Sequence, residues 1–167
     1  QSASNLDALP VKYSNSLIEA FRAFAANLGL LSFNTSLANK LTNNLQSVVI
    51  TSAIPGEGKS TVALNLARAS ASMGKQVLLV DTDLRSADRL TTDLSFESHL
   101  GLKDVLSKNN QVPVFNCIQQ LPLEENLFIL TSGLGNALHE SAAQDHSRLL
   151  ASGKMHDLMA ELEAQFD

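Results

Sequence analysis

The sequence has few of the residues that mark several common classes of protein. It contains one cysteine, one tyrosine and no tryptophan in 167 residues. The single cysteine, Cys117, excludes an internal disulfide, and its apolar neighbours favour a buried thiol in a reducing compartment. No apolar run reaches the roughly 18 residues of a membrane-spanning helix, and the polar start lacks the apolar core of a signal peptide. We therefore expect this stretch of chain to be soluble.

Charged residues are also scarce. They make up 17% of the sequence, against about a quarter in typical domains, which suggests that part of the surface is covered. The formal net charge is −5 and the pI is about 5.3. Because binding to nucleic acid requires a basic face, this balance argues against nucleic acid as a main partner. The length fits one domain with a substantial core.

The beginning of the chain differs from the rest. Residues 1–15 show little periodicity and contain Pro10 among several serines and asparagines, so we expect a linker arm. Residues 16–167 are expected to form one domain. Ser16 followed by Glu19 is typical of the capping box at a helix start. Helical spacing then predicts one apolar face made of Leu17, Phe21, Phe24, Leu28 and Leu31.

Residues 47–61, SVVITSAIPGEGKST, have the pattern of a buried strand, a tight glycine loop and the start of a helix. Gly56 and Gly58 allow backbone N–H groups to turn toward an anion, and the helix start adds its positive dipole end. Lys59 would then contact outer phosphates and Ser60 would bind Mg²⁺. The alternative is an ordinary strand, turn and helix with an incidental Gly-Lys-Ser sequence.

A second stretch, residues 76–85, is an apolar strand followed by two carboxylates, Asp81 and Asp83. The carboxyl ends of parallel strands are where ligands bind in α/β proteins. With a repeat of two residues, the two side chains would point the same way, so one reaches a metal and the other a water or hydroxyl. The alternative is that they cap the next segment or pair with Arg85.

Together, residues 53–61 and 78–85 resemble the Walker A and Walker A′ motifs of the bacterial tyrosine kinases, the ATPase modules that accompany capsule and exopolysaccharide export. The family admits alanine at the first loop position, here Ala53. The resemblance implies an α/β P-loop NTPase fold with a mainly parallel sheet and helices on both faces. It implies ATP and Mg²⁺ as cofactors, with nucleotide contacts from Pro55, Gly56, Glu57, Gly58, Lys59, Ser60, Thr61 and Arg85.

The same resemblance implies protein-tyrosine kinase activity, with phosphoryl transfer from ATP to tyrosines of neighbouring copies. Lys59, Asp81 and Asp83 would be the catalytic residues, and Ser60, Asp81 and Asp83 would hold the metal and its waters. Which aspartate takes the tyrosine proton stays open.

The resemblance also implies partners and a location. In the family, a Glu-x-x-Arg-x-x-Arg pattern on the first helix packs one subunit on the next. Glu19 and Arg22 match this pattern, but Ala25 replaces the second arginine, and a plain ion pair on a solvated face is the alternative. The family acts at the cytoplasmic side of the bacterial inner membrane, beside a membrane-embedded polysaccharide co-polymerase.

Further strands are predicted at residues 114–121 and 127–131, a short helix after His99, and an amphipathic helix at residues 149–166. His139, Glu140 and His146 lack the spacing of metal ligands, so we expect solvated loop histidines. In the family a Walker B strand and a tyrosine-rich tail follow such a helix. We therefore expect residues 1–167 alone, whose one tyrosine is Tyr13, to be unstable and nearly inactive.

Two other functions stay open. ParA or MinD type ATPases share this fold, but their signature lysine stands where this chain has Ile54. A non-catalytic module that binds nucleotide only to assemble with the export machine is favoured by Ala25 and the single tyrosine. Phosphotyrosine on the full-length protein would separate this module from a kinase.

Overall fold

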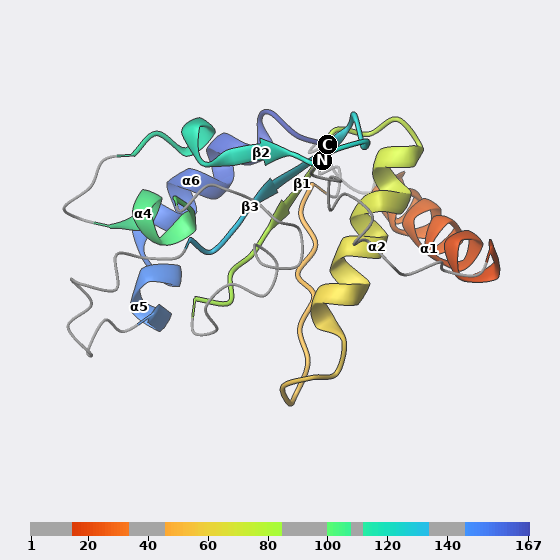
Figure 1. The fold of residues 1–167 in the computed structure, drawn as a ribbon, viewed down its shortest axis with the longest axis horizontal. Coiled ribbons are helices and arrows are strands. Elements are labelled where there is room, and N and C mark those ends of the chain that lie inside the picture. The colour runs from red at the N-terminus through yellow and green to blue at the C-terminus, as the bar shows by residue number, and fades with distance from the viewer. Residues whose placement is uncertain (1–14, 34–45, 85–99, 108–111, 134–145) are drawn as a thin grey trace, which may run out of the picture.

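The computed structural model describes residues 15–33, 46–84, 100–107, 112–133 and 146–167 (Figure 1). The elements, in chain order, are α1 (Asn15–Phe33), α2 (Lys59–Ser72), β1 (Val77–Val80), α4 (Leu102–Leu106), the 3₁₀ helix η2 (Val114–Asn116), β2 (Ile118–Gln120), β3 (Leu127–Leu130), α5 (His146–Leu150) and α6 (Gly153–Glu163). Three strands lie among the helices of these residues, with α4 and η2 between β1 and β2, and β3 directly after β2.

The sheet has the strand order β1, β3, β2. β1 and β3 are parallel, with Val77 opposite Leu127, whereas β2 runs antiparallel to β3. The prediction of parallel strands thus holds for the β1–β3 pair. The predicted strand at residues 114–121 is shorter than expected, because its first half forms η2 and only Ile118–Gln120 joins the sheet.

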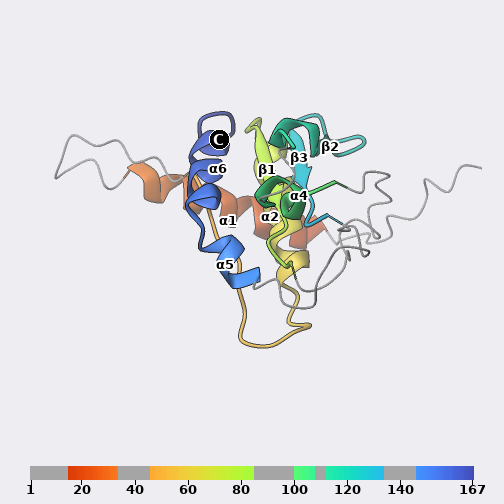
Figure 2. The ribbon, with the colours of Figure 1, turned by 90° about the vertical axis from the view of Figure 1, so that its left-hand side faces the viewer.

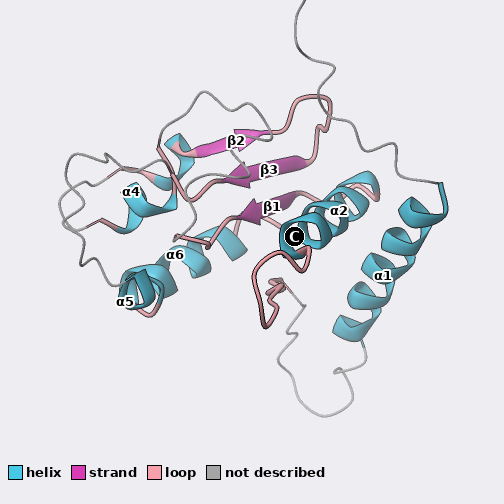
Figure 3. Cartoon of the chain, turned by 60° about the horizontal axis from the view of Figure 1, so that its bottom comes forward, coloured by secondary structure: helices cyan, strands magenta, loops and turns pink. Residues whose placement is uncertain are grey.

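Helices pack on both faces of the sheet, as predicted. The alternation of side chains along β3 sends Leu127 and Ile129 toward Ala67 and Ala71 of α2. Leu130 packs on the other face, in a cluster with α4 and with Leu158 and Leu162 of α6. In Figure 3, α1 and α2 lie to the right of the strands, while α4, α5 and α6 lie to the left.

The segment before the glycine loop is not the buried strand that the sequence predicts. Residues 46–52 are extended but belong to no strand in the described part of the chain. Val48 is 47% exposed and Val49 is 86% exposed. A strand is defined by hydrogen bonds to a neighbour, and no described segment pairs with this one. Apolar sequence alone cannot supply that partner.

The first helix forms where predicted, with two corrections. Helix α1 begins at Asn15, so Ser16 lies inside its first turn and is not the N-cap. The buried stripe is Phe21, Ala25 and Leu28, which pack against α2 and Ile50. By contrast, Leu17 and Phe24 of the predicted face are 39% and 45% exposed. Ala25, which is not part of the predicted face, is 7% exposed and packs with Leu66 and Ala69 of α2.

The last predicted helix is divided in two. α5 ends at Leu150, and Ser152 caps α6 by accepting a hydrogen bond from the Met155 N–H at 3.2 Å. Leu158 and Leu162 are buried and Phe166 is half-buried, which confirms the predicted apolar line. Cys117 is 1% exposed, which confirms the prediction of a core thiol.

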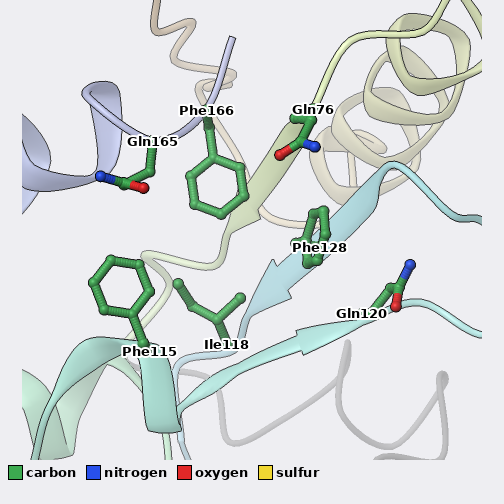
Figure 4. A pocket seen from close by; sticks show the side chains of 7 residues that line it. All are labelled: Gln76, Phe115, Ile118, Gln120, Phe128, Gln165 and Phe166. Atoms are coloured by element: carbon green, nitrogen blue, oxygen red, sulfur yellow. The ribbon is translucent and has the colours of Figure 1, made fainter.

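A hollow of about 440 Å³ lies on the α6 side of the sheet (Figure 4). Phe128 and Phe166 meet edge to face beside it, with ring centroids 5.5 Å apart. Gln76 directly precedes β1 and lines the hollow. The hollow therefore lies at the end of β1 opposite to the end that carries Asp81.

The short helix α4 is fixed to the end of β3 by two close glycines. The N–H groups of Leu102 and Lys103 donate to the carbonyls of Thr131 (2.8 Å) and Ser132 (3.1 Å). A Cβ at Gly101 would lie 2.5 Å from the Thr131 carbonyl oxygen and would overlap Gly133. The backbone can approach this closely only because Gly101 has no side chain.

Candidate nucleotide-binding site

The glycine loop has the geometry that its sequence predicts. Gly56 and Gly58 have φ of 85° and 86°, a left-handed conformation that other residues rarely adopt. α2 begins immediately afterwards at Lys59, and its first helical hydrogen bond runs from the Val62 N–H to the Gly58 carbonyl at 2.9 Å. The N–H groups before Val62 lie in the helix's first turn, where no helical carbonyl precedes them. This end of the helix can therefore hold an anion.

The loop is accessible from solvent. Figure 2 shows it projecting below the helices and the sheet, and most of its residues are exposed. Thr51, Ala53 to Glu57, Ser60 and Thr61 are exposed, while Gly58 and Lys59 are half-buried. A polyanion such as a nucleotide can reach the predicted contacts without any change in the helices.

The Lys59 ammonium lies across the mouth of this loop. Its Nζ donates to Ser52 Oγ at 2.9 Å and to the Ile54 carbonyl at 3.4 Å. Ser52 Oγ in turn donates to the Ile54 carbonyl at 3.0 Å. Sequence analysis did not single out Ser52. A hydroxyl at the end of an apolar segment, directly before the first loop position, is the signal that could have found it.

Glu57 has a role in the shape of the loop. Its Oε2 accepts a hydrogen bond from the Ile54 N–H at 3.2 Å. This bond closes the turn between the two stems of the loop. Glu57 was predicted as a nucleotide contact, and in this structure its carboxylate binds the backbone of the loop itself.

The two aspartates follow β1, as predicted, but not in an extended chain. The Asp81 N–H donates to the Leu130 carbonyl at 2.9 Å, which continues the pairing of β1 with β3. Asp81 Oδ1 then accepts from the Asp83 N–H at 3.0 Å, so the chain turns and the two-residue alternation ends. Asp81 is half-buried and Asp83 is exposed. The prediction that both side chains point the same way therefore does not apply, because it assumed a continuous strand.

The available donors fit Mg²⁺ bound together with a nucleotide. Mg²⁺ prefers oxygen ligands and usually takes one or two from the protein, with phosphates and waters completing its shell. The exposed Ser60 hydroxyl and the half-buried Asp81 carboxylate offer oxygen atoms of this kind. Within the described residues, no three histidine, cysteine, aspartate or glutamate side chains are grouped to hold a metal by themselves.

Arg85, the remaining predicted nucleotide contact, lies outside the described residues, as do His139 and Glu140 of the predicted solvated loop. His146 was also expected in that loop, but it is half-buried at the start of α5, so the loop prediction is wrong for this residue. In Figure 1 the glycine loop and the chain leaving β1 both lie toward the lower side of the molecule. Residues 81–84 therefore lie toward the same side of the molecule as the glycine loop in this view.

Comparison with known families identifies this architecture. Residues 48–152, which include the loop, α2 and all three strands, match the model described as CobQ/CobB/MinD/ParA nucleotide binding domain. The chain belongs to this family. Its members share the P-loop NTPase fold, so the predicted α/β class and the nucleotide-binding role of the domain are confirmed.

Two curated relatives narrow the comparison. Tyrosine-protein kinase YwqD of Bacillus subtilis is 40% identical over 123 residues, which are 74% of this chain and 47% of that protein. Succinoglycan biosynthesis transport protein ExoP of Rhizobium meliloti is 33% identical over 120 residues, 72% of this chain and 14% of that protein. The chain thus spans about half of YwqD and a small part of ExoP. The resemblance to bacterial tyrosine kinases is confirmed by such relatives.

Solved structures agree with the sequence comparison. The crystal structure of the chimerical protein CapA2B2 superimposes with a TM-score of 0.72 at 29% identity, over 99% of this chain and 64% of that one.

Among the helices that the structure describes, none has the length and apolar character needed to cross a membrane.

Proposed function

We propose that this domain binds MgATP and carries the phosphoryl-transfer site of a protein-tyrosine kinase. The observation that supports this proposal most is the Lys59 ammonium held across a two-glycine loop at the start of α2. Identity of 40% to a tyrosine-protein kinase favours tyrosine as the acceptor. The nucleotide contacts would come from residues 55–61, with Arg85 as a further contact.

Each proposed role follows from the charge and position of the residue. Lys59 and the N–H groups at the start of α2 offset the charge of the β- and γ-phosphates. Mg²⁺, when bound, would neutralise charge on the phosphate oxygens, with Ser60 and Asp81 among its protein ligands and Asp83 near its water shell. The tyrosine oxygen forms a bond to the γ-phosphorus as the bond to the bridging oxygen breaks and ADP leaves. The phenol proton passes to Asp81 or Asp83.

A second copy of the protein is the proposed acceptor and partner. Glu19 and Arg22 form a 2.9 Å ion pair on the exposed side of α1, with side chains 67% and 46% exposed. Such a pair contributes little to the stability of one chain, so it is available to a neighbouring subunit. Ala25, the third position of the pattern, is buried against α2 and cannot take part.

The setting of the protein is part of the same proposal. ExoP is named as a transport protein of polysaccharide biosynthesis, and it matches this chain over 120 residues. We infer a role in the control of capsule or exopolysaccharide export, at the cytoplasmic side of the bacterial inner membrane, next to a membrane-embedded co-polymerase.

Detection of phosphotyrosine tests the kinase proposal. The full-length protein is incubated with MgATP, probed with an antibody to phosphotyrosine, and compared with the Lys59→Met variant. We expect a signal that depends on ATP and is lost in the variant. A signal of equal strength in Lys59→Met would refute the proposed site.

A nucleotide-dependent assembly module is the second candidate, and the buried Ala25 favours it because the subunit pattern is altered. It predicts MgATP binding and a change of oligomeric state in gel filtration, without any phosphotyrosine.

A further inference from the structure

Ser52 links the two stems of the glycine loop through a chain of hydrogen bonds. Lys59 belongs to α2, on the far side of the loop, while Ser52 belongs to the extended segment that enters it. The Lys59 Nζ to Ser52 Oγ distance of 2.9 Å therefore closes the loop across its opening. A bond to an ammonium group is stronger than one between neutral groups, since the donor carries a charge.

The hydroxyl of Ser52 is oriented for this contact. A serine hydroxyl has one hydrogen to donate and two lone pairs that accept. Its hydrogen is directed to the Ile54 carbonyl at 3.0 Å, which leaves the lone pairs for the ammonium. Ile54 is itself fixed by the bond from its N–H to Glu57. Ser52 thus has one favoured orientation, set by the loop and not by the lysine.

We propose that Ser52 is a positioning residue, which holds the Lys59 ammonium at the mouth of the loop for the phosphates of the nucleotide. This inference rests on the proposed function of the loop. A lysine side chain has many rotamers, so fixing an unrestrained one costs conformational entropy. Because Ser52 already restricts Lys59 in the free protein, less side-chain entropy is lost when the nucleotide binds.

The opposite role would be a latch, in which Ser52 competes with the phosphates for Lys59. The two roles predict opposite changes in the affinity for nucleotide when the hydroxyl is removed. Removal of a positioning hydroxyl weakens nucleotide binding, whereas removal of a latch strengthens it. Lys59 keeps one further N–H group for a ligand while it donates to Ser52 and Ile54, so these contacts are compatible and positioning is favoured.

Calorimetric titration of the full-length protein with MgADP tests this role. We expect Ser52→Ala to weaken binding about 10-fold, close to the lower end of the range for a hydrogen bond to a charged group. Ser52→Thr keeps the hydroxyl and should restore affinity to within about 3-fold of wild type. Ser47→Ala is the matched control, because Ser47 lies exposed in the same segment, and it should leave affinity unchanged. Unchanged or tighter binding by Ser52→Ala, or failure of Ser52→Thr to restore affinity, would overturn the inference.

A measurement without nucleotide separates this inference from the function on which it rests. In ¹⁵N NMR of the free protein, hydrogen bonding should slow exchange of the Lys59 ammonium protons, and Ser52→Ala should remove this protection. If the wild type binds no MgADP, the proposed function of the loop fails whatever the NMR shows. If the wild type binds but its ammonium is as unprotected as that of Ser52→Ala, only the role of Ser52 fails.

Discussion

Replacing Gly101 by alanine should detach α4 from the end of β3. The added Cβ would lie 2.5 Å from the Thr131 carbonyl oxygen and 2.6 Å from the Gly133 Cα, and backbone atoms cannot move aside as a flexible side chain can. Relief of the overlap requires the two segments to separate. That movement breaks the hydrogen bonds that Leu102 and Lys103 donate to the chain after β3.

The expected loss of stability follows from these contacts. Two broken hydrogen bonds cost about 1 kcal/mol each, and overpacking adds about 1 to 3 kcal/mol. We therefore expect Gly101→Ala to lower the free energy of unfolding by about 3 to 5 kcal/mol, or the melting temperature by roughly 10 to 15 °C. Urea denaturation followed by circular dichroism measures this difference.

Gly153→Ala is the control for this experiment. Gly153 opens α6, and a Cβ added there meets no atom within 4 Å. This variant should be as stable as the wild type or slightly more stable, because alanine favours the helix. The reasoning is refuted if Gly101→Ala unfolds at the same urea concentration as Gly153→Ala.

Three further predictions concern the site and the core. Asp81→Asn and Asp83→Asn should each weaken MgATP binding more than binding of ATP without metal, with the larger effect at half-buried Asp81; equal losses in calorimetry would indicate a structural role. Arg68 and Glu124 form a 2.8 Å ion pair with side chains about a quarter exposed, so Arg68→Met should cost about 1 kcal/mol in urea denaturation, and no cost would mean that the pair is fully screened. Burial, and to a smaller extent Asp104, raises the pKa of the Cys117 thiol in the folded protein, so the free energy of unfolding should fall as the pH rises above the ordinary pKa of a thiol toward this raised value. Iodoacetamide should also label the native protein far more slowly than the unfolded one. Fast native labelling would contradict the buried position.

The sequence predicts best the features that depend on a few neighbouring residues. Gly56 and Gly58 have the positive φ that the loop pattern requires, and α2 starts at Lys59, directly after the loop. β1 is likewise confirmed, because the short apolar run before Asp81 has the composition of a buried strand.

The sequence predicts less well the features that depend on distant partners. The apolar segment at residues 47–52 has the composition of a strand, yet strand formation also needs a neighbour that composition does not reveal. The face of α1 was assigned from its large apolar residues, whereas the small Ala25 is the residue of α1 that is buried against α2. The bond between Ser52 and Lys59 joins the two ends of a loop, and only the three-dimensional path of the loop shows it.

The central claim is that the loop at residues 53–61 binds the phosphates of MgATP through Lys59. Thermal unfolding with and without MgATP tests it most directly, because a ligand at 100 times its dissociation constant stabilises the folded state by about 2.7 kcal/mol. For the wild type we expect the melting temperature to rise by several degrees. Lys59→Met should melt at the same temperature as the wild type without nucleotide, and MgATP should not raise that temperature. An equal rise in both proteins would contradict the account.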